Sequence, residues 1–136
     1  MNITVIDGHG GMLGAQLIKE ITSNFPDALI TAVGTNSVAT AAMLKAGAFS
    51  GATGENPVVV ACRKADIIIG PIGIVIADSL GGEVTPKMSV AVGQADAVRI
   101  LIPMNKCANL VAGASNIPTS TLIEDVILKL KNLINS

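Results

Sequence analysis

The chain has 136 residues and a net charge of -1 at pH 7, and half of its residues are apolar, including two Phe but neither Trp nor Tyr. A chain of this length can bury a core without disulfides or metals, so we expect one domain spanning residues 1–136. The lack of a basic surplus and of aromatic rings on which bases stack excludes nucleic acid as an expected partner.

The apolar composition also bears on cellular location. The longest apolar run, residues 67–77, is interrupted by glycine and proline and is shorter than the roughly 20 residues that span a bilayer. The first residues, MNITVIDG, have the pattern of a strand and not of a signal peptide. We therefore expect a cytoplasmic protein with no membrane partner and no metal site, in which Cys62 and Cys107 are both reduced.

Short apolar runs alternate with helix-like patterns from the first residues onward. Residues 2–6 are predicted to form a strand, and residues 12–24 a helix whose apolar positions share one side. A second strand is predicted over 28–33, followed by a helix over 37–46 that stops at Gly47. The first third of the chain thus predicts two successive units of strand and helix.

The same alternation continues through the middle of the chain. A brief third strand is predicted near residues 48–52, before a helix over 58–65 with Asn56 as its N-cap and Pro57 at its first position. A fourth strand, apolar after Asp66, is predicted over 66–69. These elements extend the alternating pattern that is typical of a parallel sheet.

The next segment, residues 70–86, has no regular pattern. Thr85 and Pro86 repeat the signature of a cap followed by proline and predict a helix over 87–95. A fifth strand is predicted over residues 98–102.

The last part of the chain predicts one more strand and one more helix. Residues 108–111 are predicted to form a sixth strand paired as a hairpin, because too few residues intervene for a parallel crossover. A closing helix is predicted over 122–134, opened by a capping box of Thr121 and Glu124. The whole pattern predicts an α/β fold: a Rossmann-like, doubly wound, mostly parallel sheet of five or six strands with helices on both faces.

Sheets of this kind bind ligands beyond the carboxyl ends of their strands, near the point where the strand order reverses. Glycine and small polar residues gather at these predicted ends. The candidate binding residues are Asp7, Gly8, His9, Gly10, Gly11 and Gly14 after the first strand, Gly34, Thr35 and Asn36 after the second, Gly70 and Pro71 after the fourth, and Asn105 and Lys106 after the fifth.

The stretch VIDGHGGMLGAQL, residues 5–17, is the most informative motif. Glycines between a strand and a helix let backbone N–H groups approach a phosphate at the positive end of that helix. The spacing departs from G-x-G-x-x-G, because Leu13 occupies the position of the third glycine. Gly14 supplies a glycine one residue later. A Walker-type loop is excluded because no Lys-Ser or Lys-Thr follows. The alternative is that these glycines serve only a tight turn and close helix packing.

The end of the second strand bears on the cofactor. An acidic residue there would bind a ribose diol, but the sequence offers the neutral Thr35 and Asn36. The cofactor is unassigned, and a nucleotide such as NADP is a candidate. If such a cofactor binds, we expect NADPH to bind at least as well as NADH, because no carboxylate of this strand repels the 2′-phosphate.

Two resemblances add to this interpretation. The segment GHGGMLGA resembles the G-x-G-G loop of the small subunit of 2-oxoacid:acceptor oxidoreductases, over little more than the first strand and helix. Over nearly the whole chain, segments such as VGTNSVATAAMLKAGA, GPIGIVIADSLGGEVTP and ILIPMNKC resemble a family of short, single-domain bacterial proteins known as a domain of unknown function (DUF3842). That resemblance implies a self-contained domain and brings no reaction with it.

Polar residues near the predicted edge leave alternatives open. His9 could contact a ligand or transfer a proton, or be merely exposed. Asp7 could orient the loop through backbone N–H groups or bind a ligand hydroxyl. Asp78, Ser79 and Glu83 lie in the irregular segment and suit a lid, an interface or a solvated loop.

The sequence therefore predicts a small phosphate-bearing ligand at the Gly8 to Gly14 loop, with two classes of function open. A binding or sensing module is favoured because the edge has few titratable groups. The alternative is a small oxidoreductase or other enzyme that uses Asp7, His9 or Lys106 at a homo-oligomer interface. A mean hydropathy of +0.62 and 14% charged residues predict a homodimer or larger assembly, with the segment from Ile72 to Leu80 contributing.

Overall fold

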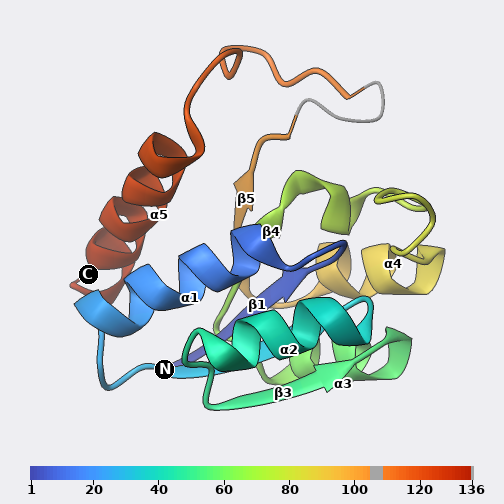
Figure 1. Cartoon of the computed structure of the whole chain (residues 1–136), viewed down its shortest axis with the longest axis horizontal. Coiled ribbons are helices and arrows are strands. Elements are labelled where there is room, and N and C mark those ends of the chain that lie inside the picture. Colours follow the sequence, from blue (N-terminus) through green and yellow to red (C-terminus); the bar gives the residue numbers. More distant parts are fainter. Residues whose placement is uncertain (105–108, 136) are drawn as a thin grey trace.

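The computed structural model, which describes residues 1–104 and 109–135, has an α/β fold built on a five-stranded parallel sheet (Figure 1). Its strands are β1 (Asn2–Asp7), β2 (Leu29–Gly34), β3 (Ser50–Thr53), β4 (Ile67–Pro71) and β5 (Val98–Ile102). They lie in the order β3-β2-β1-β4-β5, and each neighbouring pair is parallel. The predicted α/β class and doubly wound parallel sheet are confirmed, with five strands in the described part of the chain.

The strand order reverses between β1 and β4. From β1 the chain moves outward to β2 and β3, and it then returns to the other side of β1 to form β4 and β5. Asp7 pairs in register with Gly34 of β2, and Val5 pairs with Ile69 of β4. The carboxyl ends of β1 and β4 therefore flank the point of reversal, which is where doubly wound sheets bind their ligands.

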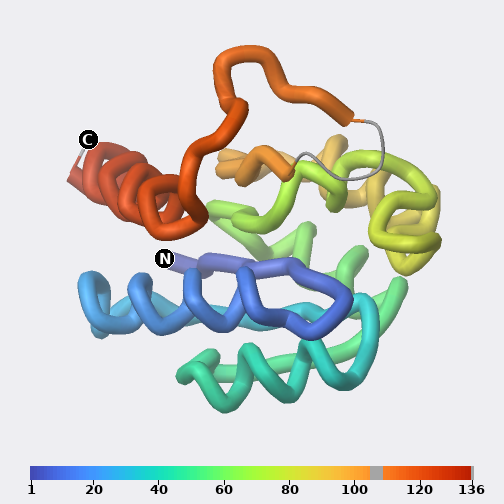
Figure 2. Tube along the Cα trace, turned by 45° about the horizontal axis from the view of Figure 1, so that its top comes forward, coloured from blue at the N-terminus to red at the C-terminus, as the bar shows by residue number. Residues whose placement is uncertain are grey.

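Helices cover both faces of the sheet, as expected (Figures 1 and 2). The helices are α1 (Met12–Asn24), α2 (Ser37–Lys45), α3 (Glu55–Lys64), α4 (Pro86–Gln94), α5 (Thr119–Ile134) and the short 3₁₀ helix η1 (Ile72–Val75). Buried side chains of α1, α2 and α5 share a core with one face of the sheet, and those of α3 and α4 share a core with the other.

Alternation along the strands supplies these two cores, because successive side chains of a strand point to opposite faces. Ile3 and Val5 of β1 pack with α1, α2 and α5, whereas Ile6 packs with α3 and α4. All five residues of β4 are buried, which matches the continuous apolar run that a covered parallel strand shows.

The start of α3 differs from the prediction. The helix begins at Glu55 with Gly54 at its N-cap, and Asn56 is not the cap. Gly54 has a φ of 107°, a conformation that glycine adopts at little cost, so this glycine turns the chain into the helix two residues earlier than predicted. Pro57 then lies in the first turn, where its missing N–H costs no helical hydrogen bond.

The last elements also correct the prediction. Residues 109–111 of the expected sixth strand are not in a strand, and residue 108 lies outside the described residues. The helix α5 begins at Thr119 without a side-chain cap, so Thr121 and Glu124 lie inside its first turns and the expected capping box is wrong. In both views the chain from 109 to 118 loops away from the sheet before α5 returns beside α1 (Figures 1 and 2).

The chain between η1 and α4 is irregular, as expected, and turns inward. We call residues 72–85 the β4–α4 segment. Asp78 and Leu80 adopt left-handed backbone with φ of 65° and 56°, which folds the segment back on itself. Ile74 is 1% exposed and packs in the core with α3 and α4. Ile74 is thus buried within the chain, whereas Ile72, Val75 and Ile76 are only half-buried, so the contribution of the segment from Ile72 to Leu80 to an interface stays a prediction.

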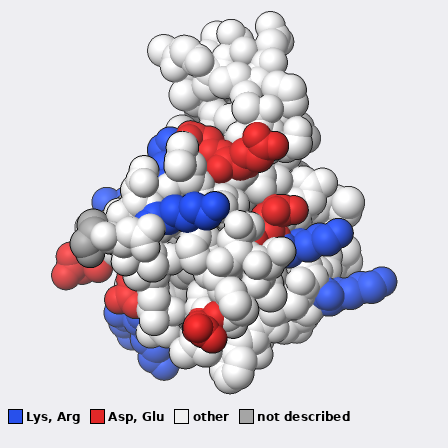
Figure 3. Space-filling model, turned by 90° about the vertical axis from the view of Figure 1, so that its left-hand side faces the viewer, with Lys and Arg blue, Asp and Glu red and all other residues white. Residues whose placement is uncertain are grey.

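Charged side chains are spread thinly over the face shown in Figure 3. Basic and acidic side chains alternate on that face, and neither sign forms a continuous patch there. Among the described residues, every helix is too short or too polar to cross a membrane.

Candidate functional site

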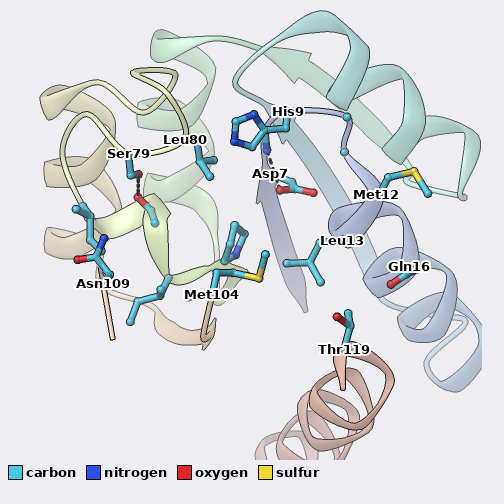
Figure 4. Close-up of a pocket in the computed structure, with 17 residues that line it drawn as sticks. Asp7, His9, Met12, Leu13, Gln16, Ser79, Leu80, Met104, Asn109 and Thr119 are labelled. Atoms are coloured by element: carbon cyan, nitrogen blue, oxygen red, sulfur yellow. Dashed lines mark hydrogen bonds between the residues drawn. The ribbon is translucent and has the colours of Figure 1, made fainter. Parts of the chain in front are cut away.

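A cavity of about 390 Å³ opens at the carboxyl ends of β1 and β4 (Figure 4). One wall is the glycine loop with the first turns of α1, and the opposite wall is the start of the β4–α4 segment. Leu13 and Met104 point toward each other across it, and Thr119 at the start of α5 closes one side (Figure 4). Its volume lies near the lower end of the roughly 300–1,000 Å³ of small-molecule sites.

Three of the four loop glycines are required by packing. A Cβ on Gly8 would lie 2.5 Å from Thr35 Oγ1, and one on Gly14 would lie 2.5 Å from Met43 Sδ. Gly11 has a φ of 73°, and its Cβ would lie 2.7 Å from the backbone of Ala39. These glycines therefore serve a tight turn and the close approach of α1 to α2 and the sheet.

Gly10 differs from the other three glycines. It lines the cavity, and the only described atom within 4 Å of its ideal Cβ is Met12 Cγ at 3.9 Å. Packing within the chain does not explain why this position lacks a side chain. A ligand that approaches the backbone closely would explain it.

Asp7 at the end of β1 holds the loop in place. Its Oδ1 accepts a hydrogen bond from the N–H of Gly8 at 2.8 Å, and its Oδ2 accepts one from the N–H of Gly14 at 2.7 Å. The second bond satisfies an N–H group in the first turn of α1 that has no acceptor within the helix. Asp7 therefore has the loop-orienting contacts that the sequence left as one alternative.

The pKa of the Asp7 carboxyl is raised above its ordinary value. Burial is the largest cause, and the nearby Glu83 carboxylate adds to it. The hydrogen bonds from Gly14 and Gly8 and the charge of His9 lower this pKa without offsetting the burial. A further negative charge placed beside Asp7 would raise it again.

Three backbone donors of the loop point to no acceptor in the part of the chain that the structure describes. They are the N–H groups of Gly10, Met12 and Leu13, whereas the N–H of Gly11 is bonded to Gly8 O at 2.9 Å. Free N–H groups at the start of a helix carry partial positive charge and bind anions.

Glu83 joins the loop to the end of β2. Its Oε1 accepts hydrogen bonds from Thr35 Oγ1 at 2.6 Å, from Asn36 Nδ2 at 2.8 Å and from the backbone N–H of His9 at 3.0 Å. Its Oε2 lies 3.3 Å from His9 Nδ1. His9 itself has left-handed backbone with a φ of 51°, so the contacts of Glu83 stabilise a strained turn.

The pKa of Glu83 reflects these contacts. Partial burial raises the pKa, but the hydrogen bonds from Thr35, the His9 backbone and Asn36, together with the charge of His9, outweigh the burial. The net pKa therefore lies below the ordinary value of a glutamate, and the carboxylate is stabilised in its charged form.

The structure brings some candidate residues together and separates others. Asp7, Gly8, His9, Gly10, Gly11 and Pro71 line the cavity. Gly14, Gly34 and Gly70 are packed against neighbouring residues, since a Cβ on each would lie within 2.6 Å of another atom. Thr35 and Asn36 face Glu83, and Asn36 also caps α2 by accepting from the N–H of Ala39. Asn105, Lys106 and Cys107 lie outside the described residues.

Sequence reasoning missed part of the cavity wall. Met12, Leu13 and Gln16 come from α1, Leu80 from the β4–α4 segment, and Met104, Asn109 and Thr119 from the chain between β5 and α5. The pattern of α1 gave a signal, because Leu13 is an apolar position next to the loop. Nothing in the sequence marks Thr119, since α5 approaches α1 only in three dimensions.

The role of Glu83 changes one expectation. The second strand carries no acid of its own, as expected, but the β4–α4 segment brings a carboxylate to its end. The reason for expecting NADPH to bind at least as well as NADH was the absence of such a carboxylate. That reason does not hold.

Comparisons with known proteins give a family. Comparison with the curated proteins finds no match. Among solved structures, a dodecameric FMN-dependent UbiX-like decarboxylase from Escherichia coli O157:H7 is similar, with 16% sequence identity, a TM-score of 0.48, and coverage of 97% of this chain and 75% of that chain. The family described as a domain of unknown function (DUF3842) matches residues 2–135, and the protein belongs to that family.

Proposed function

We propose that this protein binds a small ligand with a phosphate or similar anionic group at the Gly8 to Gly14 loop, as a binding or sensing module. The observation that carries the proposal is Gly10, which lines the cavity at the point of strand reversal and has room for a side chain that it lacks. Every other glycine of the loop is explained by packing within the chain, whereas Gly10 is explained by close approach of a ligand to the backbone.

The charges around the loop favour a ligand whose anionic end lies near the loop N–H groups. The free N–H groups of Gly10, Met12 and Leu13 lie at the positive end of α1 and favour a negative charge. Asp7 opposes it, but its raised pKa brings the carboxyl closer to the neutral form. The described lining contains no Lys or Arg, so backbone dipoles and His9 are the groups that balance the charge.

The rest of the cavity suits an uncharged ring or chain. Leu13, Ile72, Ile76, Leu80 and Met104 supply apolar surface on several sides. Small-molecule sites typically combine such walls with a few polar groups that fix orientation. The ligand that fits this description has one anionic end and one apolar or aromatic end.

An enzyme remains the second candidate. Asp7 and His9 are the titratable groups among the described lining residues, and Asp7 has a perturbed pKa, which is common for catalytic acids. We favour a binding module because both Asp7 oxygens already hold the loop. Conversion of a bound ligand during incubation, followed by mass spectrometry, would instead support the enzyme.

The test is a pair of matched substitutions. Gly10→Val places a branched side chain over the free N–H groups, whereas Gly93→Val adds the same side chain at an exposed position of α4 with nothing within 4 Å. We expect calorimetry with nucleotides and inorganic phosphate to show binding to wild type and to Gly93→Val, and at least about tenfold weaker binding to Gly10→Val. Absence of binding to the wild type by every probe would overturn the proposal.

A further inference from the structure

We infer that the site accepts a single nucleotide and that Glu83 and Leu80 exclude the second half of a dinucleotide. This inference rests on the proposed ligand site at the Gly8 to Gly14 loop and names the ligand class of that site. It follows from what fills the space between the loop and the end of β2.

The location of a second nucleotide is set by the fold. In doubly wound sheets the two halves of a dinucleotide lie on either side of the strand reversal, with the phosphates on the glycine loop. One half would occupy the cavity between β1 and β4. The ribose of the other half would lie over Gly8 and the end of β2, beside Thr35 and Asn36.

That second space is filled by the protein itself. From the position of a Cβ on Gly8, Glu83 Oε1 and Leu80 Cδ1 each lie at 2.9 Å, and Thr35 Oγ1 lies at 2.5 Å. These contacts leave no room above Gly8 even for one added carbon atom. A ribose is much larger than a methyl group, so it fits there only if the β4–α4 segment moves.

The polar groups at the end of β2 are also occupied. The Thr35 hydroxyl and the Asn36 amide both donate to Glu83, and Asn36 donates further to His9 O at 2.9 Å. Glu83 therefore takes the hydrogen bonds that a ribose would otherwise use. Displacing it would leave a partly buried carboxylate without these donors, which costs free energy.

The cavity on the other side remains open and has a volume near the lower end of the range for small-molecule sites. Its walls are apolar, and the loop N–H groups lie at one end. A mononucleotide with one phosphate and one ring system matches both features. Because the space over Gly8 is filled by protein side chains, the ligand site extends no further than the phosphate.

Matched pairs of ligands test this inference on the wild type. FMN and FAD share the flavin and its phosphate, and nicotinamide mononucleotide and NAD share the nicotinamide half, so each larger ligand adds only an adenosine monophosphate half. For the pair that binds, we expect calorimetry to show the mononucleotide binding at least about tenfold more tightly than its dinucleotide. A dinucleotide that binds as tightly as its mononucleotide would overturn the inference while leaving the proposed ligand site intact.

Variants identify the residues responsible. Glu83→Ala is expected to narrow the tenfold difference in affinity to less than about threefold, because it removes one of the two side chains of the β4–α4 segment that fill the space over Gly8 and frees the Thr35 and Asn36 donors. Glu83→Gln keeps the side-chain volume and is expected to retain the gap, and Glu20→Ala on the exposed side of α1 is the unrelated control. If Glu83→Ala fails to fold by thermal melting, Leu80→Ala replaces it with the same expectation. If the folded variant keeps the same difference in affinity between mononucleotide and dinucleotide, the role of these two side chains is overturned.

The outcomes separate the two claims. If the wild type binds neither member of either pair nor inorganic phosphate, the proposed function fails and this inference fails with it. If the wild type binds a dinucleotide and its mononucleotide equally, only the exclusion by Glu83 and Leu80 fails.

Discussion

Glu83 Oε1 accepts a hydrogen bond of 2.6 Å from Thr35 Oγ1, although the two residues are 48 positions apart in the chain. Thr35 follows β2, and Glu83 lies on the β4–α4 segment that crosses above it. The contact closes the sheet edge on one side of the glycine loop and leaves the other side open as the cavity.

The first prediction concerns stability and pH. The pKa of Glu83 is lowered in the folded state, so its contacts stabilise the fold above the ordinary value of 4.5, and this stabilisation is lost as the pH falls through the folded pKa. We expect Glu83→Gln to lower the free energy of unfolding by up to about 1 kcal/mol at neutral pH, because the amide oxygen can still accept the hydrogen bonds but carries no charge. The difference from wild type should shrink on approach to about pH 3.

Urea unfolding of wild type and Glu83→Gln at both pH values measures this difference. Glu20→Gln, at an exposed position of α1, is the control for titration of carboxylates in general. A difference between wild type and Glu83→Gln that stays constant from neutral to acidic pH would contradict the assignment of this stabilisation to the charged carboxylate.

The second prediction concerns anion binding and Asp7. Sulfate keeps its charge over the acidic range, so it reports the protonation of the protein alone. Because the pKa of Asp7 is raised, the carboxyl becomes neutral on acidification before an ordinary aspartate does, and its repulsion of an anion at the loop disappears. We expect sulfate affinity to rise several-fold between about pH 7 and about pH 4.

His9 also lines the cavity and can contribute to anion binding. His9→Gln removes that contribution, and the remaining pH dependence then belongs to Asp7. Titration calorimetry with sulfate on wild type and His9→Gln makes the comparison. Sulfate affinity that is independent of pH in His9→Gln would contradict the proposed effect of Asp7.

The third prediction separates the two roles of the loop glycines. Gly11→Ala forces a Cβ into left-handed backbone and to within 2.7 Å of Ala39, so we expect it to destabilise the fold by at least about 2 kcal/mol. Gly10→Ala meets only Met12 at 3.9 Å and should change stability by less than about 0.5 kcal/mol. Chemical denaturation of both variants tests this contrast, and equal destabilisation by the two would refute it.

The fold was largely predictable from local patterns. Strand and helix signals alternate from β1 to β5, and each is carried by neighbouring residues, such as the apolar run of β4 and the Thr85–Pro86 start of α4. The errors occurred where no local pattern decides the outcome. Gly54 competes with Asn56 as the cap of α3, and the short apolar run at residues 109–111 resembles a hairpin strand but is too short to decide between strand and loop.

The site was predictable only in part, for a physical reason. The position of the glycine loop follows from the rule that ligands bind at the carboxyl ends of parallel strands. The contact of Glu83 with Thr35 does not follow from that rule, because it depends on how the irregular β4–α4 segment folds over the sheet. Left-handed backbone at Asp78 and Leu80, two non-glycine residues, produces that path, and sequence patterns do not mark such positions.

The fourth prediction concerns the thiols. Cys62 is 4% exposed, and burial raises its pKa to about 11, so little reactive thiolate forms at mildly alkaline pH. In a Cys107→Ser variant, which leaves Cys62 alone, we expect a thiol reagent to label the protein only after unfolding in urea. Rapid labelling of this variant under native conditions would show that Cys62 is accessible.

The last prediction is self-association. We still expect a homodimer or larger assembly, because the described chain leaves large apolar side chains exposed, among them Leu110 at 88%, Phe49 at 77% and Met12 at 68%. The segment from Ile72 to Leu80 is only half-buried at several apolar positions and stays a candidate, but the fully exposed residues give the more direct test. Light scattering at micromolar concentration should give at least twice the chain mass. Leu110→Ser and Phe49→Ser, compared with each other, then identify which region forms the contact, and a monomeric wild type would remove the claim.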